Sequence, residues 1–217
     1  MINLRDYLAI QKQYLFWLVL LLFVFLLLSY IYHIEKVVYY DKLLLQKIYQ
    51  LSGTFIDLFF IFITHLGSKT FTYPMLGMLA IIYLLKRHYV LVFCLAVNLF
   101  GVRELNWLLK TWFERSRPDL EAVVRASYYS FPSGHAMNST AFYGFLAYIV
   151  WRRFKKNSIW FAAFLLVLLI GLSRIYLGVH YPIDVAAGIS AGAAWTILII
   201  VIYEAAVGRE MNEACEH

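Results

Sequence analysis

Residues 158–184 read SIWFAAFLLVLLIGLSRIYLGVHYPID, an apolar run that ends in a cluster of ionisable side chains. The apolar part has about the 20 residues that a helix needs to cross the hydrocarbon core of a bilayer. Arg174, His180 and Asp184 lie at its end or just beyond it. Ionisable residues at membrane depth are costly and mark functional sites by default. This stretch therefore predicts a membrane helix with a functional site at its carboxyl end.

The whole chain has the composition of a membrane protein. Hydrophobic residues make up 63% of its 217 residues, where a soluble domain has roughly half. Lipid offers no hydrogen-bond partner to exposed backbone groups, so apolar runs of spanning length should be helical. The predicted fold is all-α and polytopic, with six transmembrane helices. They cover approximately residues 14–32, 70–85, 89–109, 133–151, 158–177 and 184–204.

Two stretches near the N-terminus leave alternatives open. Residues 51–66 are apolar but short, and they contain Asp57 and His65. We interpret them as part of a short interfacial or re-entrant helix around 40–66, with a seventh span as the alternative. Residues 14–32 are interpreted as a retained first helix rather than a cleaved signal peptide, because no small-residue cleavage site follows them. No linker composition interrupts residues 1–217, so a single membrane domain is expected.

The basic residues indicate how the chain is oriented. One predicted turn contains Lys86 and Arg87, another contains Arg152, Arg153, Lys155 and Lys156, and neither contains an acid. Both turns should face the cytoplasm. Residues 33–69, 110–132 and 178–183 then lie on the extracytoplasmic face of a cell membrane. These clusters account for most of the net charge of +6, so no nucleic-acid partner is expected.

Polar residues gather in three blocks on that predicted face. The first block, KTWFERSRP, covers 110–118 at the end of the third span, and the second, PSGH, covers 132–135 at the start of the fourth. The third, SRIYLGVHYPID, covers 173–184 and joins the fifth span to the sixth. Because all three blocks lie at the same ends of their spans, we expect their side chains to form one site.

The residue types in these blocks suit the binding of a phosphate. Lys110, Arg117 and Arg174 supply positive charge, and each guanidinium can donate two parallel hydrogen bonds to a phosphate. Ser133 and Gly134 lie where the fourth helix begins. Their backbone N–H groups and the helix dipole can hold an anion there.

The same blocks also contain a nucleophile and an acid–base group. His180 and Asp184 are four residues apart around Pro182, so the carboxylate can reach the imidazole and fix its tautomer. The other ring nitrogen of His180 is then free to attack phosphorus. His135 remains to protonate the leaving oxygen and to activate water. No metal or other cofactor is needed, because three cationic side chains neutralise the phosphate.

The three blocks resemble the type 2 phosphatidic acid phosphatase family, whose pattern is KxxxxxxRP, PSGH and SRxxxxxHxxxD. Every fixed position of that pattern is present, in the same order, between residues 110 and 184. The resemblance implies a membrane lipid phosphatase with a phosphohistidine at His180, oriented by Asp184 and assisted by His135. It also implies a lipid phosphate substrate: undecaprenyl diphosphate, phosphatidylglycerol phosphate or phosphatidic acid.

Several alternatives stay open at this level. The phosphohistidine could pass its phosphoryl group to an acceptor other than water, or the site could bind an anionic lipid without turnover. The family is also similar to vanadium-dependent haloperoxidases, although six spans argue against that activity. Arg115 is expected to be a rim contact. Arg103 and Glu104 form either a structural pair or a wall of the substrate pocket.

Overall fold

A computed structural model of the chain describes residues 4–53, 55–124 and 129–216, with their side chains between residues 12 and 208. Within these ranges the chain forms helices joined by short segments, and it forms no strand. The helices are α1 (Leu4–Ile31), α2 (Glu35–Tyr49), α3 (Ile56–Leu66), α4 (Lys69–Leu85), α5 (Tyr89–Phe113), α6 (Gly134–Phe154), α7 (Ser158–Tyr176) and α8 (Pro182–Glu216). The predicted all-α class is confirmed.

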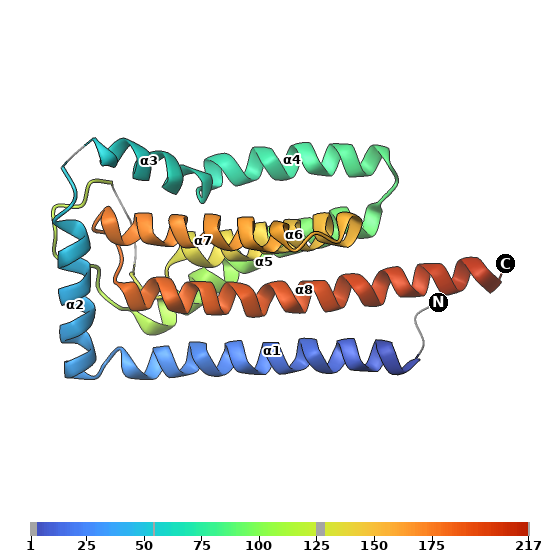
Figure 1. The fold of residues 1–217 in the computed structure, drawn as a ribbon, viewed down its shortest axis with the longest axis horizontal. Coiled ribbons are helices and arrows are strands. Elements are labelled where there is room, and N and C mark those ends of the chain that lie inside the picture. The colour runs from blue at the N-terminus through green and yellow to red at the C-terminus, as the bar shows by residue number, and fades with distance from the viewer. Residues whose placement is uncertain (1–3, 54, 125–128, 217) are drawn as a thin grey trace.

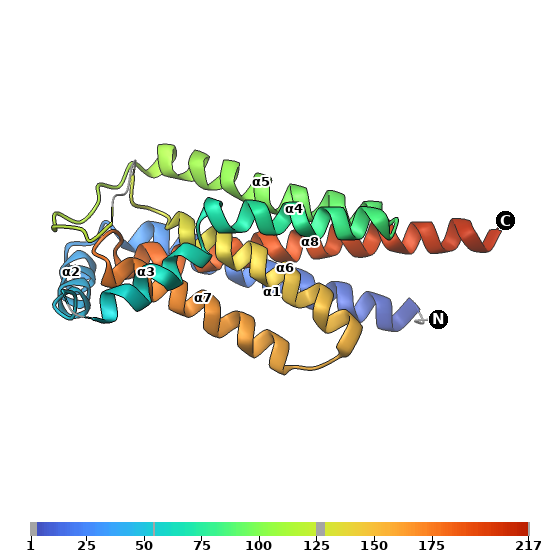
Figure 2. The ribbon, with the colours of Figure 1, turned by 90° about the horizontal axis from the view of Figure 1, so that it is seen from above.

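The helices form an elongated bundle with one helix lying across its end. In Figure 1, α1, α4, α5, α6, α7 and α8 all run along the long axis, and α2 is roughly perpendicular to them. Figure 2 shows the same arrangement from above. Helix α6 packs against α5, α7 and α8, and α1 packs against α8. Helix α1 begins and α8 ends at the end of the bundle opposite α2.

Each of the six predicted spans is a helix, and their membrane character differs with their place in the bundle. Helices α1, α5, α7 and α8 each contain a stretch that is long and apolar enough to cross a membrane. On α1, Phe23 and Leu26 are about 60% exposed, as expected of side chains that face lipid. Helix α6 is long enough to cross a membrane but more polar than these four. Its polar residues include Asn138 and Ser139, which are buried.

The predicted short helix within residues 51–66 is present as α3, but the prediction of one helix over the whole range 40–66 was wrong. That region contains most of α2 and all of α3. Helix α2 lies across the end of the bundle. Helix α3 instead continues into α4 after a bend of 43°. Together α3 and α4 are long and apolar enough for one broken span or for a re-entrant loop. Asp57 lies in the first turn of α3, where it accepts hydrogen bonds from Gly53 N–H and Tyr176 Oη. Its charge is therefore partnered at a helix end.

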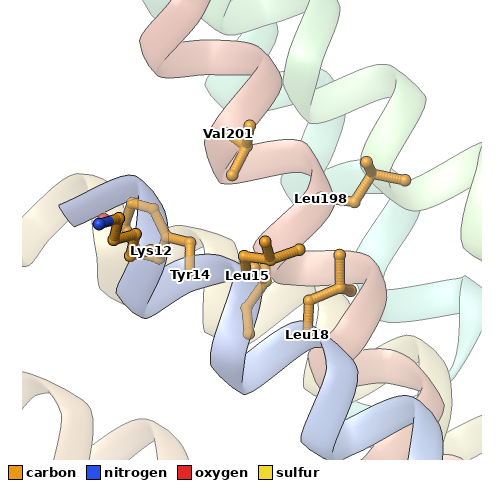
Figure 3. A pocket seen from close by; sticks show the side chains of 7 residues that line it. Lys12, Tyr14, Leu15, Leu18, Leu198 and Val201 are labelled. Carbon is orange, nitrogen blue, oxygen red and sulfur yellow. The ribbon is translucent and has the colours of Figure 1, made fainter. Parts of the chain in front are cut away.

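A shallow apolar groove of about 320 Å³ lies between α1 and α8. Figure 3 shows the side chains that line it, and apart from Lys12 and Tyr14 they are aliphatic. The lining residues are Lys12, Tyr14, Leu15, Leu18, Ile197, Leu198 and Val201. The groove contains no residue of the three polar blocks, so it is separate from the predicted site.

Small residues allow α6 and α8 to approach closely. A Cβ atom added at Gly188 would lie 2.6 Å from the carbonyl oxygen of Ser133. One added at Gly192 would overlap the carbonyl oxygen of Met137 and lie 2.9 Å from Thr140 Cβ. Glycines spaced four residues apart are the usual means by which membrane helices bring their backbones together. This contact fixes the start of α8 beside the start of α6.

Replacing Gly192 with alanine is expected to lower the thermal unfolding temperature of the purified protein in detergent. The added methyl meets backbone atoms that cannot move aside, and overpacking of this kind costs about 1–3 kcal/mol. Gly77→Ala on α4 is the matched control, because a Cβ there meets nothing within 4 Å. Equal unfolding temperatures for the two variants would contradict this account of the contact between α6 and α8.

Candidate active site

The three polar blocks meet at the end of the bundle that α2 covers. Helices α5 and α7 end there and α6 and α8 begin there, so the residues predicted from separate blocks come together (Figures 1 and 2). Contacts or electrostatic interactions link residues of all three blocks. The predicted site residues are Lys110, Arg117, Ser133, Gly134, His135, Arg174, His180 and Asp184. The structure places all of them at this end.

His180 lies in the turn between α7 and α8 and is 2% exposed. Its Nδ1 is 3.2 Å from Ser130 Oγ and 3.5 Å from Asp184 Oδ2. Its Nε2 faces the guanidinium of Arg117, with Nη1 at 3.4 Å. With its proton on Nδ1, the neutral ring can donate a hydrogen bond to these oxygen atoms. Nε2 then carries no proton and keeps its lone pair. The nitrogen suited to nucleophilic attack is therefore the one that faces a cation.

Asp184 is the most heavily hydrogen-bonded side chain of the site. It lies in the first turn of α8 and is fully buried. Its Oδ2 accepts hydrogen bonds from Ser130 Oγ at 2.5 Å and from the backbone N–H of Tyr181 at 2.9 Å. Its Oδ1 accepts one from Arg115 at 2.6 Å. Donors from several segments hold this carboxylate in one orientation beside His180.

Ser130 was not identified from the sequence. Its hydroxyl donates to Asp184 Oδ2 and can accept from His180 Nδ1–H, so it lies between the imidazole and the carboxylate. It is fully buried in the segment that precedes α6. No motif spacing distinguishes this serine from its neighbours, and only its position beside both side chains indicates a role.

The prediction that Arg115 is a rim contact was wrong. Its side chain is only 9% exposed and it joins two carboxylates, Asp184 at 2.6 Å and Asp41 of α2 at 2.8 Å. The guanidinium also lies over the rings of Tyr32 and Tyr181. Burial lowers the pKa of Arg115, but the two carboxylates outweigh burial and leave that pKa raised. Arg115 therefore holds Asp184 in place.

Asp41 extends this network to α2. Its Oδ2 accepts from Arg115, and its Oδ1 accepts from the backbone N–H of Ile183 at 3.0 Å. That N–H belongs to the first turn of α8, where an acidic side chain satisfies a donor that has no partner within the helix. Through this one carboxylate, α2 is tied to Arg115 and to the start of α8.

Three cationic side chains lie around His180. Lys110 Nζ donates to the carbonyl oxygens of Tyr129 and Ser130, and Arg117 donates to that of Val179 at 2.6 Å. Arg174 is 4% exposed and donates to Thr64 Oγ1 of α3 at 2.6 Å, while its Nε has no partner among the described residues. Each of these donors is positioned by a protein oxygen. Their charges concentrate positive potential in a region shielded from water.

The start of α6 supplies further donors. Ser133 N–H donates to the carbonyl oxygen of Asp184, so this group is not available to an anion, contrary to the prediction for Ser133. The Ser133 hydroxyl is buried and has no partner within the part of the chain that the structure describes. Helix α6 begins at Gly134, and N–H groups in the first turn of a helix have no acceptor within it. A Cβ at Gly134 would lie 2.8 Å from Asn106 Oδ1, which explains the glycine.

His135 lies on the side of the site formed by the bend between α3 and α4. A Cβ at Gly67, in that bend, would be 3.3 Å from His135 Cδ2. The imidazole interacts electrostatically with Arg174, Arg117 and His180. His135 and His180 therefore belong to the same charged region but approach it from different helix ends.

The protonation state of His180 follows from its surroundings. Burial lowers the pKa of His180 to about 3, although the hydrogen bond and charge of Asp184 act in the opposite direction. The imidazole is therefore neutral near pH 7. A neutral ring with Nδ1 protonated has an unprotonated Nε2, which is the form that attacks an electrophile.

Comparison with known proteins agrees with this geometry. The PAP2 superfamily profile matches residues 86–207, more than half of the chain and all three polar blocks. Phosphatidylglycerophosphatase B of Bacillus subtilis is 37% identical over 144 residues, which cover 63% of this chain and 70% of that protein. The putative undecaprenyl-diphosphatase YbjG of Escherichia coli is 33% identical over 117 residues, which cover 51% of this chain and 54% of that one.

A solved structure extends the similarity to the fold. The crystal structure of a transmembrane PAP2 type phosphatidylglycerolphosphate phosphatase from Bacillus subtilis superposes with a TM-score of 0.82 at 30% sequence identity. The match covers 86% of this chain and 96% of that one. The family profile, the sequence relatives and the solved structure all indicate the same family. The chain therefore belongs to the PAP2 superfamily and is a multi-pass membrane lipid phosphatase.

Proposed function

We propose that this protein removes the terminal phosphate of a lipid through a phosphohistidine on His180. The observation that supports this most strongly is the arrangement of the His180 ring. Nδ1 is held by Ser130 and Asp184, while Nε2 faces the guanidinium of Arg117. A buried, neutral imidazole with one nitrogen fixed and the other directed at an anion-binding region is suited to nucleophilic attack on phosphorus.

In the first step, Nε2 of His180 forms a bond to phosphorus as the bond between phosphorus and the lipid oxygen breaks. Lys110, Arg117 and Arg174 neutralise the three non-bridging oxygens, on which negative charge is spread in the transition state. His135 donates a proton to the departing lipid oxygen. The positive charge that develops on the His180 ring is stabilised by Asp184 through the Nδ1 side.

In the second step, water replaces the histidine on phosphorus. His135, now without its proton, accepts one from the attacking water while the bond between phosphorus and Nε2 breaks. Inorganic phosphate leaves and both histidines regain their starting protonation. In this scheme the cationic side chains supply the charge stabilisation that divalent ions supply in many phosphatases, so the reaction is metal-independent.

Among lipid phosphates, phosphatidylglycerol phosphate is the first candidate substrate. The Bacillus subtilis relative and the superposed crystal structure both carry this activity in their names. Undecaprenyl diphosphate is supported by the Escherichia coli relative. Phosphatidic acid completes the set, because it presents the same terminal phosphate on a lipid.

We also propose six membrane crossings with the active site on the extracytoplasmic face. The crossings are α1, the bent pair of α3 and α4, α5, α6, α7 and α8. The turn at 86–88 and the turn at 155–157 lie at the end of the bundle opposite α2 and the site. These turns and their flanking residues carry the clustered lysines and arginines that favour the cytoplasm.

Substituting His180 with alanine is expected to abolish phosphate release from detergent-solubilised lipid phosphates, because no nucleophile remains. The wild-type protein should keep its rate in excess EDTA. His88→Ala, at an exposed position in the opposite turn, is the matched control and should retain activity. Lipid labelled with ³²P on its terminal phosphate should leave acid-labile label on the wild type and on His88→Ala, but not on His180→Ala. Activity that requires a divalent metal, or that survives in His180→Ala, would contradict the mechanism.

Substituting Ser130 with alanine is expected to lower kcat with little change in KM, because the hydroxyl positions the nucleophile and does not bind substrate. The expected loss is about 10- to 100-fold, since a hydrogen bond to a charged group contributes about 1.5–3 kcal/mol. Ser190→Ala is the control, because this buried serine on α8 donates only to Leu21 O. A raised KM at unchanged kcat would show instead that Ser130 contacts the substrate.

Labelling of single cysteines tests the orientation. With Cys94 and Cys215 replaced by serine, Glu121→Cys in the segment between α5 and α6 should react with a membrane-impermeant maleimide in intact cells. Lys156→Cys, in the turn between α6 and α7, should react only after the membrane is permeabilised. Glu121 and Lys156 are both exposed and lie outside the helices, so the reaction of a cysteine at either position with the maleimide depends on the side of the membrane. The reverse pattern would place the site in the cytoplasm.

A further inference from the structure

Arg103 is a charged residue within a membrane helix that the mechanism above does not use. It lies on α5 seven residues before Lys110, which places it on the same side of the helix and roughly 10 Å deeper along it. It makes no ion pair with Glu104, which is exposed, among the ion pairs of the described residues. The guanidinium turns toward α4, where Nη2 donates to Thr72 Oγ1 at 2.8 Å and Cζ lies 4.7 Å from the Tyr73 ring.

Arg103 is part of the same charged region as His135. The two side chains interact electrostatically. Thr72, which holds the guanidinium, also donates to Ser68 O in the bend between α3 and α4. Gly67, in the same bend, packs directly against the His135 ring. Arg103 therefore lies on the side of His135 that is deeper in the bundle than Lys110.

Among the described residues, buried polar atoms without hydrogen-bond partners lie on this side of the site. Arg103 Nε is one of them, and Ser139 Oγ is another. Ser139 is fully buried one helical turn after His135, and its Oγ is 2.7 Å from the position of a Cβ at Gly67. Leaving buried donors unpaired costs about 1–3 kcal/mol each, so a cluster of them next to a catalytic histidine indicates a ligand.

The chemistry of the ligand follows from the position of His135. In the proposed mechanism His135 protonates the oxygen of the leaving group, so the group beyond it, toward the membrane interior, is the lipid that departs. Three other cations already surround the transferred phosphate. A further guanidinium on the leaving-group side is suited to a second anion. Phosphatidylglycerol and undecaprenyl phosphate carry a phosphate anion as they leave, whereas diacylglycerol is neutral.

We propose that Arg103 binds a phosphate on the leaving group and so selects lipids with two phosphates over phosphatidic acid. This inference rests on the proposed function. As the bond between phosphorus and the lipid oxygen breaks, the second phosphate stays on the lipid, and Arg103 remains bound to it. Thr72 fixes the guanidinium and Ser139 supplies a neutral donor nearby. The two phosphates are separated by a three-carbon spacer in phosphatidylglycerol phosphate and are linked directly in a diphosphate. The same guanidinium would therefore bind the second phosphate at a different depth in each lipid.

The test compares kcat/KM of the full-length protein in detergent on three substrates: phosphatidylglycerol phosphate, undecaprenyl diphosphate and phosphatidic acid. In Arg103→Gln the ratio of kcat/KM for a two-phosphate lipid to that for phosphatidic acid should fall by about 10- to 100-fold, the effect of losing one charge-assisted hydrogen bond. Arg103→Lys, which keeps the charge, should restore part of the ratio. A fall confined to one of the two-phosphate lipids identifies which leaving group Arg103 binds.

Two further variants separate selectivity from folding. Thr72→Val keeps the charge of Arg103 but removes its hydrogen bond, and it should lower the same ratio to a smaller extent. Arg153→Gln, at an exposed arginine at the opposite end of the bundle, should leave the ratio unchanged. An equal loss on all three substrates in Arg103→Gln, or an unchanged ratio, would overturn the proposal. Because His180→Ala tests the nucleophile independently, failure of the selectivity test leaves the phosphohistidine mechanism standing.

Discussion

The buried carboxylate of Asp184 is the constraint on which this end of the molecule depends. A fully buried anion is tolerated only when it is paired and hydrogen-bonded, and Asp184 is bonded by Arg115, Ser130 and the Tyr181 N–H. These donors come from the segment between α5 and α6 and from the turn before α8. Asp41 adds α2 through Arg115. Satisfying one carboxylate therefore fixes the positions of three separate segments around His180.

The membrane sets the second condition. Helices that face lipid need apolar outer surfaces, so polar groups gather where helices face one another or where they end. Helix α6 lies among α5, α7 and α8, and its side chains Asn138 and Ser139 are buried there. The bend between α3 and α4 adds Gly67 and Thr72 to the same interior. A straight helix over these residues would not give the same packing of Gly67 against His135.

The cations of the site are held ready for an anion. Lys110 and Arg117 donate to backbone carbonyl oxygens, and Arg174 donates to a threonine, so their side chains are ordered before any ligand arrives. Charges that are already oriented in a region of low dielectric stabilise a transition state with little reorganisation. Arg103, deeper in the bundle, is likewise held by a protein oxygen, because it donates to Thr72 Oγ1. In the proposed mechanism, Lys110, Arg117 and Arg174 surround the transferred phosphate and Arg103 lies on the side of the departing lipid.

The sequence alone determined the six long apolar helices and the motif residues, because both depend on local spacing. Apolar runs of spanning length gave the all-α class, and the ends of these runs placed Lys110, His135 and His180 on one face. The contacts of Arg115 with Asp184 and Asp41 join residues 69 and 74 positions apart, and only the packing of helix ends brings them together. Arg115 and Arg117 are two residues apart in a segment without periodicity, so no pattern could show which guanidinium is buried against a carboxylate. Ser130 and the bend at Gly67 were missed for the same reason: their roles come from neighbours distant in the chain.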